Sequence, residues 1–474
     1  MDDSLDPRTH PSQEERAALG RAARAATPRS SHAGWSPPED RPDPVSLLQE
    51  QAKSRVPGLV PIRHARMLIS PFSYFRGAAL PMASDLAHTP VSGLPAQLCG
   101  DAHLSNFGIF ASPERHLVFD VNDFDETHPG PWEWDVKRLA ASLEVAARDA
   151  GFDDTERRRI VQESARSYRE TMRAFAERSM LATWYEHLDL ESLVPRFEAM
   201  LDPHRTPAVW HAIEKARAHD SVQAYERLTH LVDGEPRIIS DPPLLVPVEQ
   251  FMPEMDEGTV LDVLRTLIGA YRRTLQSDRR HMLAQYRVVH MARKVVGVGS
   301  VGTQAWIVLF LDRDARDPLF LQAKEAQPSV LEAFTTKSGF AEHGQRVVMG
   351  QRLMQATSDI FLGWERVEWA GESHDYYLRQ LRDWKGSVDI AGMTPAGMEL
   401  WGEMCGWTLA RAHARSGDRI AIAAYLGGGD VFDRAIVEFA DAYADQNERD
   451  FEALKKAVAV GRVPAAPDPN AASS

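Results

Sequence analysis

Two closely spaced runs, CGDAHLSNF at residues 99–107 and LVFDVNDFDE at residues 117–126, combine apolar segments with a dense set of polar side chains. The apolar segments at 96–98, 107–110 and 117–121 have the composition of buried strands. The aspartates, the histidine and the asparagines stand where these strands end. A carboxylate beside a buried strand is costly unless it is paired or holds a metal ion. We therefore expect a functional site in these loops.

The spacing of these polar residues suits metal-assisted transfer of a phosphoryl group. Asp101 would orient an acceptor hydroxyl, with His103 beside it as a second catalytic candidate. Asn106 and Asp123 would bind Mg²⁺, and Asp125 would be a further carboxylate ligand. Mg²⁺ prefers oxygen ligands and binds together with substrate phosphates. Protein kinases place an aspartate, an asparagine and an Asp-Phe-Gly sequence in the same order.

The choice of the main metal ligand stays open at this point. Asp120 is nearer than Asp123 to Asn106 in the sequence. Phe124 follows Asp123, as in the Asp-Phe-Gly sequence of kinases, and this favours Asp123.

A long helix is expected at residues 132–148, and Asp135 lies in its first turn. An acidic residue there interacts favourably with the helix dipole. The alternative is that Asp135 reaches back to brace the Asp101 loop, which makes it a candidate site residue.

A second group of candidate residues begins after residue 286. Gly297, Gly299 and Gly302, with Ser300 between them, form a Gly-x-Gly-x-x-Gly pattern between two expected strands. The dinucleotide-binding form of this pattern must open a helix. Between antiparallel strands it fits the flexible flap that covers the phosphates of ATP.

Lys324 is the single charged residue in the apolar run 319–324. A lysine on a half-buried strand needs an anion, unless its chain extends to solvent. The lysine of the third kinase strand contacts the ATP phosphates and a helix glutamate. We expect Glu332 to be this partner of Lys324.

Composition excludes several classes of protein. The chain has 474 residues, 43% of them hydrophobic, and a formal net charge of -14. This charge argues against a general nucleic-acid binder or membrane-surface binder. No run approaches the roughly 18 apolar residues of a membrane span. The two cysteines, Cys99 and Cys405, offer no disulfide framework or zinc pattern, so a cytoplasmic location is expected.

The motifs predict an α+β protein with a kinase-like, two-lobed fold. Residues 46–286 would form a helical catalytic part, with the catalytic and metal loops at 99–126, and residues 386–460 would complete this large lobe with further helices. In the middle of the chain, the pattern predicts helices at 188–201, 205–218, 220–232 and 257–288. Residues 287–385 would form a small antiparallel sheet lobe that binds nucleotide, with 382–385 at the place of a kinase hinge. The terminal segments 1–45 and 461–474 are expected to be disordered.

The order of the motifs predicts that this fold is circularly permuted. In a kinase the glycine flap and the lysine precede the catalytic and metal loops, whereas here they follow them. Cutting the usual order before the catalytic loop and joining its ends gives the order of this chain. The helix expected at 401–413 would then be the one that normally leads into the catalytic loop. This arrangement requires Gly299 and Lys324 to lie near Asp101 and Asp123.

Three runs, at 99–108, 120–126 and 409–418, resemble those of the uncharacterised bacterial family called domain of unknown function 2252. The resemblance covers about residues 46–457 and implies no settled activity. The first run is also similar to the His-Gly-Asp loop of aminoglycoside phosphotransferase-like kinases, with Cys99 in place of the histidine. That likeness implies ATP and Mg²⁺ as cofactors.

The leading hypothesis is therefore an ATP- and Mg²⁺-dependent phosphotransferase, with nucleotidyl transfer as a variant. One alternative is a nucleotide-binding pseudokinase that regulates a partner. The other is a metal-dependent hydrolase with Asp101, His103, Asp123 and Asp125 as ligands. The sequence identifies neither the acceptor, a small molecule or a protein, nor the oligomeric state.

Overall fold

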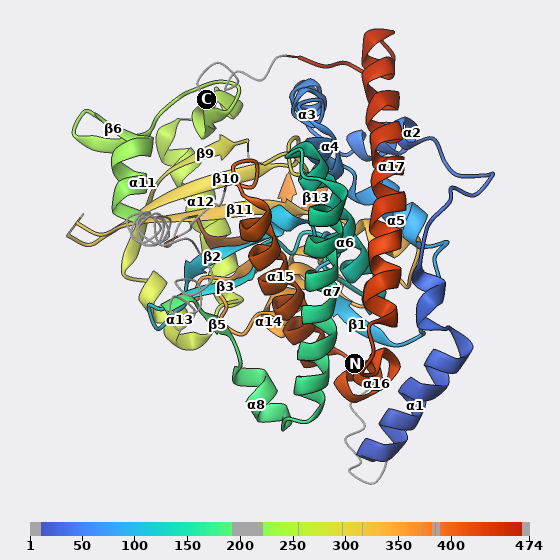
Figure 1. The fold of residues 1–474 in the computed structure, drawn as a ribbon. Coiled ribbons are helices and arrows are strands. Elements are labelled where there is room, and N and C mark those ends of the chain that lie inside the picture. The colour runs from blue at the N-terminus through green and yellow to red at the C-terminus, as the bar shows by residue number, and fades with distance from the viewer. Residues whose placement is uncertain are drawn as a thin grey trace.

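The computed structural model describes residues 11–191, 221–254, 256–295, 297–314, 316–369, 371–381, 384 and 389–466. Within them the chain forms an α+β fold with antiparallel sheets, as the sequence predicts. Figure 1 shows the largest sheet beside α11–α13, with α7, α15 and the long helix α17 on the other side of the molecule.

The largest sheet has six antiparallel strands in the order β12-β13-β11-β10-β9-β8. Their bounds are β8 Leu245–Pro247, β9 Tyr286–Lys294, β10 Ala305–Asp312, β11 Pro318–Ala326, β12 Gly363–Trp369 and β13 Glu372–Gln380. The central strands β10 and β11 are almost continuously apolar and buried, because both faces of the sheet are covered. The predicted antiparallel sheet, with the glycine pattern in the loop from β9 to β10, is confirmed.

Helices cover both faces of this sheet. Tyr271, Leu275 and Leu283 pack with alternate residues of β10 and β11 on one face. On the other face, Ala224 and Leu228 cover the intervening residues of these strands. The elements between and beside the strands of this sheet in the sequence are α11 Ser221–Leu228, β6 Thr229–Val232, β7 Glu235–Ile238, η5 Val248–Phe251, α12 Glu257–Arg273, α13 Ser277–Leu283, η6 Val330–Ala333 and α14 His343–Met354.

The second part of the molecule is a helical core with a two-stranded and a three-stranded sheet. Trp132 and Tyr168 stack at its centre with ring centroids 5.4 Å apart, and both are buried. Strand β1 pairs with β4. The strands expected at 107–110 and 117–121 pair as β2 and β3, and β3 also pairs with β5. The bounds are β1 Pro95–Leu98, η4 Leu104–Asn106, β2 Phe107–Ala111, β3 Leu117–Val121, β4 His128–Pro131, α6 Trp132–Asp149, α7 Asp154–Ala176, α8 Met180–Tyr185, β5 Leu188–Asp189, α15 Pro395–Ser416, α16 Arg419–Leu426 and α17 Val431–Ala459.

The segment before β1 is also folded. Its elements are α1 Gln13–Ala26, η2 Arg29–His32, α2 Pro44–Ala52, η3 Pro57–Leu59, α3 Val60–Met67, α4 Pro71–Gly77 and α5 Ala79–Leu86. The expectation of disorder for residues 1–45 is therefore wrong for residues 11–45. Ser12 and Glu15 form a capping box at the start of α1, and Arg16 forms an ion pair with Asp418 at 2.8 Å. At the other end Val463 is buried, so the same expectation is wrong for residues 461–466.

The middle of the chain is less helical than predicted. The helix expected at 220–232 ends at Leu228, and a hairpin of β6 and β7 follows around Asp233 and Gly234, both with positive φ. Asp-Gly is a strong hairpin signal that outweighs the helical pattern. The helix expected at 257–288 is divided into α12 and α13 before β9 begins. Strand β8 joins the large sheet, so the β-rich part begins before residue 287.

Some predictions concern residues outside the described ranges. The helix expected at 205–218 lies there entirely, as does most of the one expected at 188–201. The first residues of the helix expected at 188–201 instead form the short strand β5. Of the expected hinge at 382–385, only Trp384 is described.

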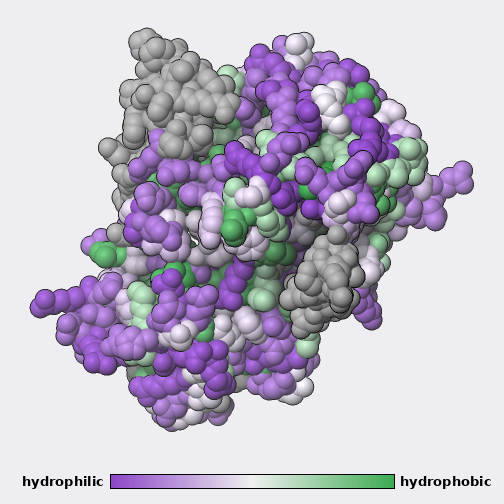
Figure 2. All heavy atoms as spheres, turned by 90° about the horizontal axis from the view of Figure 1, so that it is seen from below, coloured by the Kyte–Doolittle hydropathy of each residue, from purple (hydrophilic) through white to green (hydrophobic). Residues whose placement is uncertain are grey.

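Hydrophilic residues predominate on the face drawn in Figure 2, and hydrophobic ones show mainly around its middle. Among the described residues, no helix is both long and apolar enough to cross a membrane. Cys99 and Cys405 are buried free thiols.

The close packing of α1 on α16 gives a test of the N-terminal fold. A Cβ atom at Gly20 would lie 2.0 Å from the carbonyl oxygen of Ala421. We expect Gly20→Ala to lower the free energy of unfolding by about 1–3 kcal/mol, because α1 must move away. The control is Gly269→Ala in α12, where no atom lies within 4 Å. It should raise stability by up to about 1 kcal/mol. Denaturant unfolding of both variants measures this, and equal effects would contradict the packing of α1.

Candidate functional site

A cavity of about 1590 Å³ lies where the β1–β4 loops meet the large sheet. Two of these loops keep the names of the roles that the sequence predicts for them: residues 99–106 are the catalytic loop, and residues 122–126 are the metal loop. The predicted site residues that line it are Asp101, His103, Asn106, Asp123, Asp125, Gly297, Gly299, Ser300, Lys324 and Glu332. The structure thus brings together two segments that are nearly 200 residues apart in the sequence. Asp135 and Gly302 do not line the cavity, although they hold loops that do.

Lys324 lies at the centre of this arrangement. Its side chain is 2% exposed, and its Nζ lies 2.5 Å from Oδ2 of Asp125 and 3.4 Å from Asp123. Tyr377, its cross-strand neighbour on β13, donates a 2.5 Å hydrogen bond to Oδ1 of Asp125. Burial opposes the charge of Lys324, but the two carboxylates outweigh burial and raise its pKa above the ordinary value. Lys324 is therefore a buried cation held by the metal-loop carboxylates.

The predicted pairing of Lys324 with Glu332 is wrong. Glu332 closes a capping box with Ser329 at the start of η6 and also accepts a hydrogen bond from the backbone of Ser338. These local hydrogen bonds occupy both oxygens of the Glu332 carboxylate. The neighbouring helix α14 instead contributes Arg346, which donates to the backbone oxygen of Asp125 at 2.8 Å.

Asp101 is fixed by a residue that the sequence analysis missed. Arg138 on α6 donates from Nε at 2.9 Å and Nη2 at 2.7 Å, both to Oδ1 of Asp101. Asn106 donates its side-chain N–H to the backbone oxygen of Asp101 at 2.8 Å, which turns the amide oxygen of Asn106 away from that carbonyl. Arg138 stands one helical turn after Asp135, and this i, i+3 spacing is the signal that could have revealed it.

His103 is a neutral group at physiological pH. Burial lowers its pKa to about 4, and its Nε2 lies 3.8 Å from Oδ2 of Asp101. His103 therefore borders Asp101 without contributing a positive charge.

Asp135 braces the catalytic loop, which is one of its two predicted roles. Its carboxylate accepts the backbone N–H groups of Cys99 at 2.8 Å and Gly100 at 3.0 Å, and it lies 3.2 Å from Nε2 of His413. Asp135 is 1% exposed and does not line the cavity, so it can affect a ligand there only through the loop that it holds. Gly100 also touches the metal loop, because its φ is +82° and a Cβ there would lie 2.1 Å from the backbone oxygen of Glu126.

The choice between Asp120 and Asp123 follows from burial. Asp120, on β3, is 2% exposed and pairs with Arg411 at 2.5 Å. Asp123 lines the cavity and is partly exposed. Of the two, only Asp123 can contact a ligand in the cavity.

The glycine loop approaches the metal loop directly. The hydroxyl of Ser300 lies 3.3 Å from Oδ2 of Asp125. Gly302 has a φ of +94°, and a Cβ there would lie 3.0 Å from the side chain of Arg55. The backbone N–H of Val56 donates to the oxygen of Gly302 at 2.8 Å, so the N-terminal helices hold this end of the loop.

No group of three or more His, Cys, Asp or Glu side chains in the described ranges is placed to hold a metal ion by itself. The set expected for a metal-dependent hydrolase is therefore not assembled: Asp101, His103, Asp123 and Asp125. A metal ion in this cavity would need ligands from a substrate or water, which is how Mg²⁺ is usually bound beside phosphates.

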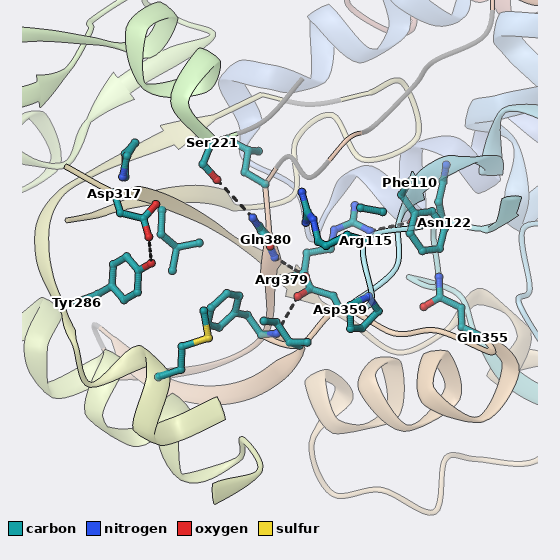
Figure 3. A pocket seen from close by; sticks show the side chains of 18 of the residues that line it. Phe110, Arg115, Asn122, Ser221, Tyr286, Asp317, Gln355, Asp359, Arg379 and Gln380 are labelled. Carbon is teal, nitrogen blue, oxygen red and sulfur yellow. Dashed lines mark hydrogen bonds between the residues drawn. The ribbon is translucent and has the colours of Figure 1, made fainter. Parts of the chain in front are cut away.

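A second cavity, of about 410 Å³, lies behind Asn122 and Arg379, which line both cavities. Figure 3 shows hydrogen bonds between several of its polar residues, among them Tyr286 with Asp317 and Ser221 with Gln380. Tyr286 donates to Asp317 at 2.5 Å, and Arg379 donates to the backbone oxygen of Asn122 at 2.8 Å. None of the predicted site residues lines this smaller cavity, so the larger cavity is the better candidate site.

Comparison with known proteins gives one match. The sequence model of a bacterial family, described as an uncharacterized protein conserved in bacteria (DUF2252), matches residues 55–457. The chain belongs to this family. The match confirms the resemblance, and it spans all of the predicted site residues. No curated protein and no solved structure matches the chain.

Glu126 provides a test of the burial of the metal loop. Burial raises its pKa to about 7, and it accepts the backbone N–H of Val330 at 2.7 Å. A carboxyl group whose pKa is raised on folding begins to destabilise the native state when the pH rises above its pKa in the unfolded chain. The loss is complete above its pKa in the native state. We expect Glu126→Gln to increase the free energy of unfolding by about 2 kcal/mol at pH 8, with the gain lost as the pH falls to about 4.5.

The measurement is urea unfolding of wild type and variant between pH 4.5 and pH 8. Glu438→Gln on the exposed side of α17 is the control and should show no such pH dependence. A Glu126→Gln variant that is less stable at pH 8 than at pH 5, relative to wild type, would contradict the burial of this carboxyl group.

Proposed function

We propose that this protein is an ATP- and Mg²⁺-dependent phosphotransferase with a circularly permuted kinase-like fold. The observation that carries the proposal is the meeting of Lys324 with Asp123 and Asp125 in one cavity, beside the glycine loop. A buried lysine, two carboxylates and a glycine loop are the groups that hold the phosphates and metal ions in kinases.

The order of elements in the large sheet supports this proposal. Strand β9, the glycine loop, β10, the lysine-bearing strand β11 and helix α14 follow one another along the chain. Kinases place their glycine loop, lysine strand and next helix in the same succession.

The end of α15 supports the permutation. Ser416 accepts the backbone N–H of Gln97 at 3.2 Å, and a Cβ at Gly417 would lie 2.9 Å from the backbone oxygen of Pro95. The last turn of α15 therefore lies against β1, the strand that leads into the catalytic loop. Joining these two ends would restore the usual order of kinase motifs.

The roles of the residues follow from their positions. Asn106 and Asp123 would hold Mg²⁺, with Asp125 as a further ligand. Lys324 would exchange a carboxylate partner for phosphate oxygens. Asp101 would take the proton of the acceptor hydroxyl on Oδ2, because Arg138 occupies Oδ1.

In this reaction the acceptor oxygen forms a bond to the γ-phosphorus of ATP, the bond to the β–γ bridging oxygen breaks, and ADP leaves. Positioning and charge neutralisation supply most of the rate enhancement in such transfers. Nucleotidyl transfer in the same cavity would release pyrophosphate instead, so the products separate the two reactions.

One observation favours a second function, that of a nucleotide-binding regulator without transfer activity. Helix α14 carries Arg346 and no glutamate, and its sequence is HGQRVVMGQRLM. Active protein kinases use a glutamate of this helix to hold the lysine. In this chain Asp125 takes the place of that glutamate in holding Lys324. Asp125 is also a proposed metal ligand, so the lysine and the metal ion would share it.

Nucleotide binding tests the proposal. ATP with Mg²⁺ should raise the thermal unfolding midpoint of the wild type, equivalent to about 2.7 kcal/mol of stabilisation at a hundredfold excess over Kd. Lys324→Ala and Asp123→Asn should each lose this shift, because they remove a phosphate contact and a metal ligand. Lys455→Ala, on the exposed surface of α17, is the matched control and should keep it.

Circular dichroism of each variant shows whether it is folded before the titration. The proposal fails if no nucleotide shifts the midpoint while Mg²⁺ alone does so in both the wild type and Lys324→Ala.

A further inference from the structure

The segment before β1 contributes three arginines to the cavity: Arg55, between α2 and η3, Arg63 on α3 and Arg76 on α4. They lie beside the glycine loop, since a Cβ at Gly299 would be 3.1 Å from the backbone oxygen of Arg76. The proposed roles of the catalytic and metal loops use none of these arginines.

Arg63 on α3 is a buried cation that lacks an acidic partner. Its side chain is fully buried, and Nη2 donates to the backbone oxygen of Gly77 and to Oε1 of Gln51, each at 2.8 Å. Its Nε and Nη1 are buried and have no hydrogen-bond partner among the described residues. Arginine stays charged in proteins, and a buried charge without a counter-charge is strongly unfavourable.

Arg76, at the end of α4, is similarly unpaired. Its Nε is buried, and its guanidinium makes no hydrogen bond or ion pair within the part of the chain that the structure describes. Burial lowers its pKa, and the carboxylate of Asp101 acts in the opposite direction. Oδ1 of Asp101, however, already accepts both donors of Arg138.

Other buried arginines of this protein use their donors on the chain itself. Arg169 pairs with Asp433 at 2.9 Å, and Arg411 pairs with Asp120 at 2.5 Å. Two more, Arg415 and Arg419, donate from Nε to backbone oxygens. Arg55 differs from Arg63 and Arg76 because it bonds the glycine loop itself, at the backbone oxygen of Val301 (2.6 Å), although its buried Nε also has no partner among the described residues. Arg55 therefore holds the glycine loop, whereas Arg63 and Arg76 make no bond to that loop and keep donors for a ligand.

We propose that Arg63 and Arg76 form an oxyanion-binding site that holds the anionic group, a phosphate or a carboxylate, of the acceptor substrate. Arg63 donates a hydrogen bond to the carbonyl of Gly77, the residue after Arg76. The two arginines therefore come from two helices, α3 and α4, that pack against each other. Guanidinium groups bind phosphate and carboxylate oxygens with charge-assisted, often bidentate, hydrogen bonds.

The assignment to the acceptor rests on the proposed function and on the position of Arg76. Arg138, which binds Asp101, also donates to the backbone oxygen of Phe75 at 2.9 Å. Phe75 is the residue before Arg76, so Arg76 comes close to Asp101, the residue proposed to take the proton of the acceptor, and both line the cavity. Lys324, which is proposed to hold the nucleotide phosphates, is paired with the metal loop instead. An acceptor bound by Arg63 and Arg76 would thus reach Asp101 with a hydroxyl group.

Isothermal titration with inorganic phosphate, and separately with acetate, tests the site. Each anion is titrated into the full-length protein alone and into protein saturated with ADP and Mg²⁺. We expect phosphate or acetate to bind in both states, and the stronger of the two indicates the class of acceptor. Arg76→Gln should weaken this binding by about tenfold or more and leave the affinity for ADP within about twofold. Arg265→Gln, 63% exposed on α12, should bind as the wild type does.

Arg63→Gln is a second variant and should also weaken anion binding, and Arg76→Gln decides the result if Arg63→Gln does not fold. The inference is overturned if the wild type binds neither anion, or if Arg76→Gln loses ADP and phosphate affinity in parallel. If the wild type does not bind ADP, the proposed function fails. Anion binding that Arg76→Gln weakens would then still support the oxyanion site.

Discussion

The structure depends on the burial of one ammonium group. Lys324 is 2% exposed, and the carboxylates that neutralise it come from a loop nearly 200 residues earlier in the chain. Without Asp125 and Asp123 a lysine at this position of β11 would be strongly destabilising. The large sheet and the helical part must therefore fold against each other, and the cavity forms where they meet. Tyr377 and Arg346 hold the same loop from β13 and α14.

A second buried network gives the catalytic loop its shape. Asp135 accepts the backbone N–H groups of Cys99 and Gly100 and lies beside His413 at the end of α15. One turn later on α6, Arg138 fixes Asp101. Helix α6 thus positions the loop, while α15 approaches it from a distant part of the sequence. The two networks hold the proposed catalytic and phosphate-binding groups in the lining of one cavity.

The sequence predicted an element correctly where the residues of that element and its neighbours in the chain are enough to determine it. The glycine loop between two strands, the strand of Lys324 and the helix of Asp135 needed only periodicity and flanking residues. The partner of Lys324 could not be predicted in this way, because Glu332 is near in sequence and Asp125 is near only in space. The N-terminal helix α1 was missed for a similar reason, since its stability depends on the close fit of Gly20 against α16.

The central claim is that the cavity between Lys324 and Asp123 binds nucleotide and metal. A crystal structure of the protein with a non-hydrolysable ATP analogue and Mg²⁺ tests this most directly. The account predicts phosphates between the glycine loop and Lys324, with Mg²⁺ on Asp123 and the amide oxygen of Asn106. A structure with the analogue bound elsewhere, and with Lys324 still paired to Asp125 across an empty cavity, would contradict it.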